Sequence, residues 1–227
     1  MFDFNKVQVI GVTQPVVDFI PNSEGILSYA ARVSNEENQE NFSTAGKLLA
    51  YCVRHKHYSV FETCNLTIEI ETPRDIARQI LRHRSFSFQE FSQRYAQSTN
   101  FITRECRLQD EKNRQNSIDV SATEGETQAG LINDWYLMQQ EVLEVVQANY
   151  QTALDMGIAK EVARVILPEG LTMSRMYMNG TVRSWLHFIN VRDDEGVAQK
   201  ETVDVARKAK KEILKHFPFL EEVIGVV

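Results

Sequence analysis

The hydrophobic pattern of this chain switches repeatedly between two periods, and this switching limits the possible folds more than any other feature. Residues 6–13 and 63–70 alternate apolar with polar side chains, which is typical of half-buried strands. Residues 26–33 and 48–53 instead place apolar side chains three or four positions apart, which predicts helices. The chain therefore combines strands and helices.

The same mixture continues to the C-terminus. Pro73 suits the first turn of a helix, and residues 131–156 are the longest helix candidate. The apolar stripe of that long helix consists of Ile132, Trp135, Met138, Val142 and Val145. We further expect a short helix over residues 158–166, a strand over 172–178, and helices over 181–191 and 197–216, with Pro218 as the stop. Residues 84–100 and 107–128 lack a clean period, and we interpret the first as an extended functional loop.

Length and composition favour one globular domain covering residues 1–227. Three scattered cysteines cannot build a disulfide framework, so we expect reduced thiols and a cytoplasmic location, in a cell or in the host of a virus. We see no apolar run as long as a membrane span and no signal peptide, so no membrane partner is expected. The net charge of -6 and the pI near 5.5 argue against general attraction to nucleic acid.

The strongest chemical feature is the run Arg82-His83-Arg84 at the predicted end of the helix after Pro73. Arg74, Arg78 and Arg82 recur at i, i+4 spacing and would share one helix face. The polar groups that follow are Ser85, Ser87, Gln89, Glu90, Ser92, Gln93 and Arg94. Guanidinium forks, hydroxyls and amides together suit a phosphate attached to a heterocycle.

A surface interpretation of these arginines is equally compatible with the composition. Cations at a helix C-terminus complement the helix dipole, and Asp75 and Glu71 could pair with the guanidinium groups. Arg164 poses a similar choice, because it stands alone in the apolar run 162–166. It either extends to solvent or meets an anion, such as a ligand phosphate or the Glu161 carboxylate.

Two further groups of polar residues could carry chemistry. The first is Arg183, Ser184, His187, Asn190 and Arg192, which a helix would place largely on one face, with Arg192 at its end. The second is His55, His57, Ser59, Glu62 and Thr63, which we interpret as a turn with surface histidines. Neither an HExxH motif nor a Cys/His quartet occurs, so we expect no metal.

Several common motifs are absent. There is no GxGxxG opening a helix, no phosphate-binding P-loop and no GxSxG elbow. Cys52, Cys64 and Cys106 have no evident activating histidine, so a thiol nucleophile is not expected.

Arg82-His83-Arg84, followed after seven residues by Ser92, resembles the signature of the flavin-dependent thymidylate synthases. Other segments resemble that family in the same order, from about residue 30 to residue 200. They are Ala31-Arg32-Val33-Ser34, residues 57–62, Ala77-Arg78-Gln79, Ser92-Gln93-Arg94-Tyr95, residues 164–168 and residues 183–192.

The resemblance implies conversion of dUMP to dTMP, a methyl transfer. It implies 5,10-methylenetetrahydrofolate as carbon donor, FAD as hydride carrier and NADPH as the reductant of the flavin. It also implies a mixed α/β fold, in which a central sheet is flanked by helices, and a homotetramer with sites shared between subunits. Arg192 would stabilise negative charge on the uracil ring, so that no enzyme nucleophile is needed.

The resemblance also assigns the binding residues. The dUMP site would consist of Gln79, Arg82, Glu90, Ser92, Gln93, Arg94, Arg164 and Arg192. The FAD site would consist of Ser34, Ser59, Arg82, His83, Arg84, Glu90, Thr181, Arg183 and His187, with His57 near the flavin or folate. We therefore expect the guanidinium groups of Arg82, Arg164 and Arg192 to converge on one phosphorylated pyrimidine.

The chain departs from the family pattern at four places. Gln89 replaces a common Asn, Val60 a Pro and Thr63 a His, while the stretch around Gly196-Val197 lacks a usual His and is one residue longer. We assign no folate or NADPH contact to that stretch. The alternative function is a non-catalytic nucleotide- or RNA-binding protein with the same fold, against which the acidic net charge argues.

Overall fold

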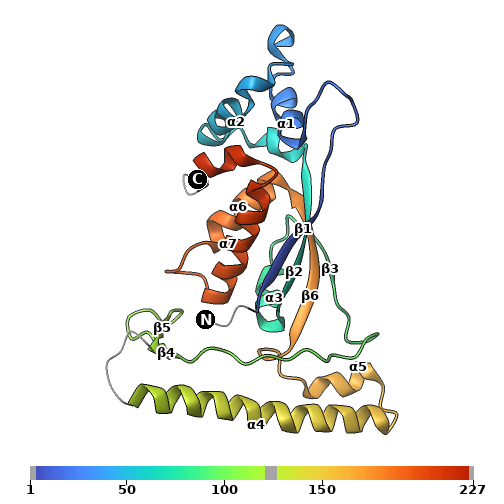
Figure 1. Cartoon of the computed structure of the whole chain (residues 1–227), viewed down its shortest axis with the longest axis vertical. Coiled ribbons are helices and arrows are strands. Elements are labelled where there is room, and N and C mark those ends of the chain that lie inside the picture. Colours follow the sequence, from blue (N-terminus) through green and yellow to red (C-terminus); the bar gives the residue numbers. More distant parts are fainter. Residues whose placement is uncertain (1–3, 121–126, 225–227) are drawn as a thin grey trace.

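A four-stranded antiparallel sheet forms the centre of the structure, a computed structural model that describes residues 4–120 and 127–224. Its strands lie in the order β1 (Lys6–Val12), β2 (Asn65–Pro73), β6 (Met173–Thr181) and β3 (Ser87–Glu90). β2 and β6 pair along their whole lengths, from Asn65 opposite Thr181 to Pro73 opposite Met173. The sheet predicted from the alternating segments is therefore confirmed, with β6 extended to Thr181 (Figure 1).

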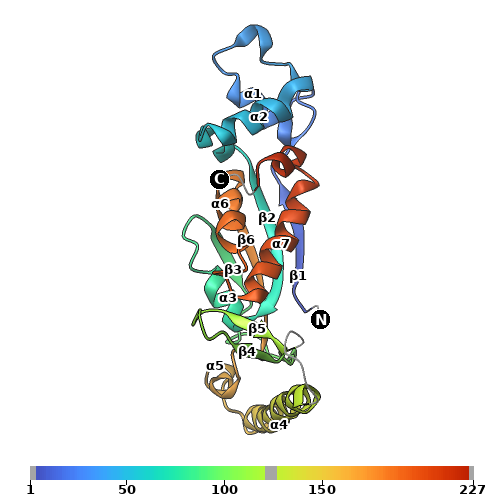
Figure 2. The same cartoon turned by 90° about the vertical axis from the view of Figure 1, so that its left-hand side faces the viewer.

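Helices α3 (Arg74–Ile80), α6 (Val182–Arg192) and α7 (Lys200–Leu214) lie beside the sheet (Figures 1 and 2). Their apolar faces meet the inward side chains of the two central strands, which have no solvent exposure and include Leu66, Ile68, Ile70, Met176 and Met178. Trp185 and Phe188 of α6 fill the space above them. This packing fixes α6 and the end of α3 against the same core, which matters for the site below.

Two further units lie at opposite ends of the sheet (Figure 1). At one end, α1 (Ser23–Ala31) and α2 (Ala45–Arg54) pack together, and the turn η6 (Pro218–Glu222) contacts α2. At the other end lies α4 (Thr127–Asp155), with α5 (Lys160–Ala163) and the turn η5 (Arg164–Ile166) packed on it. α1 begins at Ser23, because the Asn22 side chain caps it by accepting a hydrogen bond from the Gly25 amide at 2.8 Å.

Four local predictions need correction. Pro73 is the last residue of β2, so α3 begins only at Arg74. Residues 84–100 are not entirely a loop, because residues 87–90 form the edge strand β3. The polar stretch 107–128 contains the two-stranded sheet of β4 (Arg107–Gln109) and β5 (Ser117–Asp119), while residues 121–126 lie outside the described residues. α7 ends at Leu214, and Pro218 begins η6 rather than stopping the helix.

The apolar stripe predicted on α4 faces solvent in the single chain. Ile132, Trp135, Met138, Val142 and Val145 are 46%, 38%, 59%, 45% and 56% exposed. α4 is held to the rest of the chain through another face, which carries the buried side chains Gln139, Leu143 and Tyr150. Of the helices described, none has the combination of length and apolarity that spanning a membrane requires.

Candidate functional site

One aromatic side chain anchors the loop that joins α3 to β3. Phe86 packs edge-to-face against Trp185, with ring centroids 4.8 Å apart, and its ring covers Gly180 of β6. A Cβ atom on Gly180 would lie 2.4 Å from the Phe86 ring, so the absence of a side chain lets the ring reach the sheet. The basic run that ends two residues before Phe86 is therefore held against the core.

The end of α6 meets this loop through hydrogen bonds from Arg192. Its Nε donates to Nε2 of His83 at 2.8 Å, and its Nη2 donates to the main-chain oxygen of Gln79 at 3.4 Å. Burial, together with the positive charges of Arg192 and His187, lowers the pKa of His83 to about 4. His83 is therefore a neutral hydrogen-bond acceptor near neutral pH.

The side chain of Gln79 is also held at both of its polar atoms. Its Nε2 donates to Oε1 of Gln199 at 2.7 Å, and its Oε1 accepts from the hydroxyl of Thr202 at 3.2 Å. Gln199 is the N-cap residue of α7, and Thr202 has no solvent exposure. The first turn of α7 and its N-cap thus fix the orientation of the Gln79 side-chain amide.

Positive charge in this region is not neutralised by the protein. Among residues 4–120 and 127–224, neither Arg82 nor Arg192 forms an ion pair with a carboxylate. Burial of Arg192 and the nearby positive charge of Arg82, whose side chain is exposed, lower the pKa of Arg192. Such an arrangement favours an anionic ligand.

A cavity of about 610 Å³ adjoins the same helix. It is lined by Tyr58, Glu62, Ser85, Arg183, Ser184, Leu186, His187, Asn190 and Val191. Arg183 donates to Glu62 at 2.9 Å and stacks over the Tyr58 ring. The two polar side-chain atoms of Asn190 are buried and have no hydrogen-bond partner in the described part of the chain. We call the residues on this side the α6 group: Gln79, Arg82, His83, Arg183, His187, Asn190 and Arg192.

A second set of predicted residues lies beside α5 and the start of α3. We call it the α5 group: Arg74, Arg78, Glu90, Arg94, Glu161, Arg164 and Glu169. Here carboxylates face the arginines: Arg74 lies 3.5 Å from Glu90, Arg94 lies 3.2 Å from Glu161, and Arg78 lies 3.4 Å from Glu169. Glu90 also accepts a hydrogen bond from the Ser174 hydroxyl at 2.8 Å.

Arg164 is partly exposed and does not pair with the Glu161 carboxylate, one of the anions that the sequence suggested. The apolar run around it is not buried, because Val162 and Val165 are 54% and 76% exposed. Its Nε donates to the main-chain oxygen of Glu161 at 3.3 Å, while the Glu161 carboxylate pairs with Arg94 instead. Asp75 and Glu71, which the sequence suggested as partners of the arginines on the α3 face, pair instead with Arg104 and Lys6, respectively.

Within one chain the two groups adjoin only on α3, where Arg78 and Gln79 are consecutive residues. Among the described residues, no hydrogen bond or ion pair links a member of the α6 group to a member of the α5 group. Figure 1 shows α5 at the end of the sheet next to α4, whereas α6 runs beside the sheet. Arg82 is therefore close enough to Arg192 to affect its charge, whereas Arg164 lies in the other group.

The remaining predicted residues are distributed around these groups. Ser34 follows α1 and is exposed, Ser59 is exposed in the turn η3 (Tyr58–Glu62), and His57 packs edge-on to Tyr51 at 6.2 Å. Arg84 is exposed, and Thr181 is the N-cap of α6, accepting from the Ser184 amide at 3.2 Å. Ser92 begins a turn that its main-chain oxygen closes to Tyr95 and Ala96, and Gln93 is buried against Ser98.

Sequence reasoning missed the residues that hold others in place. Gln199 and Thr202 orient Gln79, Tyr58 stacks on Arg183, and Ser174 holds Glu90. One of these had a signal in the sequence, because Ser174 is a polar residue on the inward-facing side of a strand. Burial raises the pKa of Cys52, and raises that of Cys64 to about 11, which disfavours the thiolate form of both residues.

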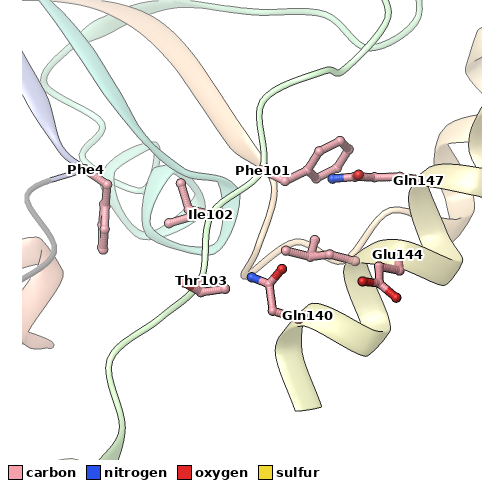
Figure 3. Close-up of a pocket in the computed structure, with 8 residues that line it drawn as sticks. Phe4, Phe101, Ile102, Thr103, Gln140, Glu144 and Gln147 are labelled. Atoms are coloured by element: carbon pink, nitrogen blue, oxygen red, sulfur yellow. The ribbon is translucent and has the colours of Figure 1, made fainter. Parts of the chain in front are cut away.

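Another cavity, of about 450 Å³, lies between residues 101–103 and α4 (Figure 3). Phe4, Phe101 and Ile102 line one part of it, and Gln140, Glu144 and Gln147 of α4 line the other. Its lining contains neither an arginine nor a histidine, so it lacks the groups that bind phosphate. The chemistry concentrates in the two arginine-containing groups.

Comparison with known proteins gives consistent matches. The family described as thymidylate synthase complementing protein matches residues 15–219. The probable flavin-dependent thymidylate synthase of Paramecium bursaria Chlorella virus 1 is 46% identical over 224 residues, covering 98% of this chain and 100% of that protein. The flavin-dependent thymidylate synthase of Synechocystis sp. is 48% identical over 216 residues, covering 93% of this chain and 95% of that protein. A crystal structure of the UMP/dUMP methylase PolB from Streptomyces cacaoi, bound with 5-Br dUMP, superposes with a TM-score of 0.74 at 25% identity, covering 98% of this chain and 95% of that one.

Proposed function

The chain belongs to the flavin-dependent thymidylate synthase family, and on this premise we propose how its own residues, acting as one domain of residues 1–227, methylate dUMP to dTMP. The carbon comes from 5,10-methylenetetrahydrofolate, and FAD is the cofactor that NADPH reduces. The observation that carries the proposal is the unneutralised positive charge of Arg82 and Arg192 on the half-buried side of α6.

FAD fits the cavity beside α6. The lining combines the aromatic and aliphatic surfaces of Tyr58 and Leu186 with the polar groups of Arg183 and His187, as a flavin ring and its charged tail require. The buried amide of Asn190 has no partner in the described chain, a state that costs about 1–3 kcal/mol and that a hydrogen-bonding ligand would relieve. When bound, FAD supplies the hydride that turns the transferred carbon into a methyl group.

We assign the FAD contacts to two residues that line this cavity, Arg183 and His187, and to seven residues that do not line it. The latter are Ser34, Ser59, Arg82, His83, Arg84, Glu90 and Thr181, and His57 is assigned as a neighbour of the flavin or folate. Arg183 is already oriented by Glu62 and Tyr58, so it can meet an anionic part of the ligand without first being ordered.

Arg192 is the residue to which we assign catalysis. Carbon 5 of uracil becomes nucleophilic when negative charge on the imide nitrogen and carbonyl oxygens is stabilised. A guanidinium group does this without changing its own protonation state, and a half-buried one does so more strongly than one in water. Binding of the dUMP sugar and phosphate is assigned to Gln79, Arg82, Glu90, Ser92, Gln93, Arg94 and Arg164.

These dUMP ligands lie in both groups, so we propose that two copies of the chain complete each site. The α5 group of one subunit would supply Arg164 to the α6 group of another. The exposed apolar stripe of α4 supports association, because a patch of this kind on a soluble chain usually meets a partner. The proposed assembly is the homotetramer that the family resemblance implies.

The test of activity uses the purified protein with dUMP, 5,10-methylenetetrahydrofolate, NADPH and FAD. We expect a yellow protein that releases FAD on denaturation and forms dTMP, measured by chromatography. A protein that neither binds FAD nor oxidises NADPH with dUMP present would refute the function.

Site sharing has its own test. At dUMP concentrations well below KM, co-expression of Arg192→Ala and Arg164→Ala chains should give more activity than either variant gives by itself. Random assortment leaves about a quarter of the shared sites intact. Absence of any recovery in mixed tetramers would show that each site is built within one chain.

A further inference from the structure

We propose that His83 is a positioning residue that fixes the guanidinium plane of Arg192 by accepting a hydrogen bond from its Nε. The inference rests on the proposed function, because it assigns how the catalytic guanidinium is aimed. A guanidinium group is planar, so two hydrogen bonds in different directions determine its orientation. The two here are Nε to His83 Nε2, at 2.8 Å, and Nη2 to the Gln79 main-chain oxygen, at 3.4 Å.

This arrangement leaves part of the fork free for the substrate. Of the five N–H donors of a guanidinium, the Nε–H and one Nη2–H are used, and both acceptors belong to the α3 end of the loop. The Nη1 donors and the second Nη2 donor remain for a uracil carbonyl and imide nitrogen. A guanidinium held at one edge and open at the other is suited to stabilise a charge that develops during the reaction.

The imidazole can serve as a reference point because it is itself fixed by packing. Its ring lies 5.0 Å from Phe188 in an edge-to-face arrangement and 6.4 Å from Phe86. Phe86 is in turn wedged between Trp185 and Gly180. The position of the acceptor nitrogen is thus set by the hydrophobic core rather than by solvent-exposed contacts.

The hydrogen bond defines the protonation state of His83. Nε2 accepts from Arg192, so the ring is neutral and its proton is on Nδ1. Burial disfavours a second proton on the ring most strongly, followed by the nearby charges of Arg192 and His187 of α6. Its pKa is lowered to about 4, so it does not exchange protons as a general base near neutral pH.

A matched pair of variants separates the acceptor from the ring. His83→Phe keeps an aromatic ring against Phe188 but has no acceptor, whereas His83→Gln places a carbonyl oxygen where Nε2 lies. We expect His83→Phe to lower kcat for dTMP formation by about 10–100-fold with little change in KM for dUMP, because a misplaced group loses transition-state stabilisation first. His83→Gln should recover most of that loss. FAD content and Tm are measured for both, and His83→Leu replaces His83→Phe if the latter does not fold.

A double mutant built on Arg192→Lys tests whether His83 acts through Arg192. In Arg192→Lys the side chain has no Nε–H fork, so adding His83→Phe should cause no further loss of kcat. The inference is overturned if His83→Phe matches the wild type, if His83→Gln is as impaired as His83→Phe, or if the two losses multiply. Because His83 is also assigned to the FAD site, kcat is measured at saturating FAD, so that weaker cofactor binding is not mistaken for a misplaced guanidinium.

A readout that does not need turnover keeps this inference separate from the proposed function. In protein labelled with ¹⁵N-arginine, the Arg192 Nε–H resonance, assigned by its loss in Arg192→Lys, should exchange slowly in the wild type and rapidly in His83→Phe. If the wild type makes no dTMP but its Arg192 Nε–H still exchanges slowly, the contact with His83 is supported and only the proposed function is refuted. Equal exchange rates of this Nε–H in the wild type and in His83→Phe would show that His83 does not bind Arg192.

Discussion

The α6 group and the α5 group contain similar residues but treat positive charge in opposite ways. In the α6 group, Arg82 and Arg192 have no carboxylate partner in the described chain, and the nearest ring, His83, is neutral. In the α5 group, Arg74, Arg78 and Arg94 each face a glutamate within 3.5 Å. Within the described chain, only Arg183 of the three α6-group arginines faces a carboxylate, whereas three of the four α5-group arginines, all but Arg164, do so.

This difference suggests a division of labour. A cation without a partner attracts charge that appears on a ligand, so the α6 group suits the uracil and flavin chemistry. Arginines already paired with exposed carboxylates can exchange those partners for a phosphate at modest cost, because surface ion pairs contribute only about 0–1 kcal/mol. The α5 group therefore suits the binding of the dUMP phosphate in the shared site that we propose.

The largest expected effect comes from removing the unpaired cation. Arg192→Ala should lower dTMP formation by at least about 100-fold, because charge on the uracil would lose its stabilising donor. FAD content, measured by absorbance after denaturation, should stay close to that of the wild type. Turnover within twofold of the wild type would show that the unneutralised charge of the α6 group is not catalytic.

A smaller effect is expected in the α5 group. Arg164→Ala should raise KM for dUMP by about 10-fold with kcat nearly unchanged, as expected when one charge-assisted contact to a phosphate is lost. Arg78→Ala is the matched control, because it removes an arginine of the same group that we do not assign to dUMP. If Arg164→Ala instead lowers kcat and leaves KM unchanged, the division between the two groups is wrong.

The sequence predicted the secondary-structure elements that carry the α6 group, but it did not predict how the α6 group and the α5 group are placed in space. The strong apolar periods of residues 63–70 and 181–191 located β2 and α6, because these segments are buried on a defined face. The four-residue strand β3 was missed, since it pairs with only one neighbour, β6, and its outward residues are polar. Short edge strands depend on tertiary pairing rather than on local pattern.

The site shows the same limit. Motif residues such as Arg82 and Arg192 could be singled out from the sequence, but their distance from Arg164 could not. That separation arises because α4 carries α5 and η5 away from α6, and the exposure of the α4 stripe depends on whether another subunit covers it. Contacts such as His83 with Arg192 join positions 109 residues apart, which no local spacing reveals.

Stability provides a test of how the α6 group is anchored. Gly180→Ala should destabilise the fold by about 1–3 kcal/mol, because the new Cβ would lie 2.4 Å from the Phe86 ring. Dislodging Phe86 should also reduce dTMP formation, since that ring supports His83. Gly130→Ala is the control: nothing lies within 4 Å of its Cβ and it occupies a helix, so it should gain up to about 1 kcal/mol. Equal denaturation midpoints for the two variants would contradict the claim that the contact of Phe86 with Gly180 anchors the loop.

The smallest effect is a pH dependence specific to the α6 group. The pKa of His83 is lowered to about 4 in the folded chain, below its usual value of 6.5, so the unfolded chain binds a proton there first. The contribution of His83 to stability is therefore present above pH 6.5 and is lost as the pH falls toward 4.

Glu201 titrates in a different pH range and serves as the control. Burial opposes ionisation of Glu201, but Arg104 and Arg107 outweigh burial and lower its pKa to about 2, so the contribution of Glu201 to stability is lost only below its usual pKa of 4.5. Between pH 4.5 and 6.5, urea denaturation should thus show a pH slope of up to about one proton in the wild type that His83→Gln lacks and Glu201→Gln keeps. The same slope in wild type and His83→Gln would mean that His83 is protonated in the folded chain, and the neutral acceptor that distinguishes the α6 group from the α5 group would not exist.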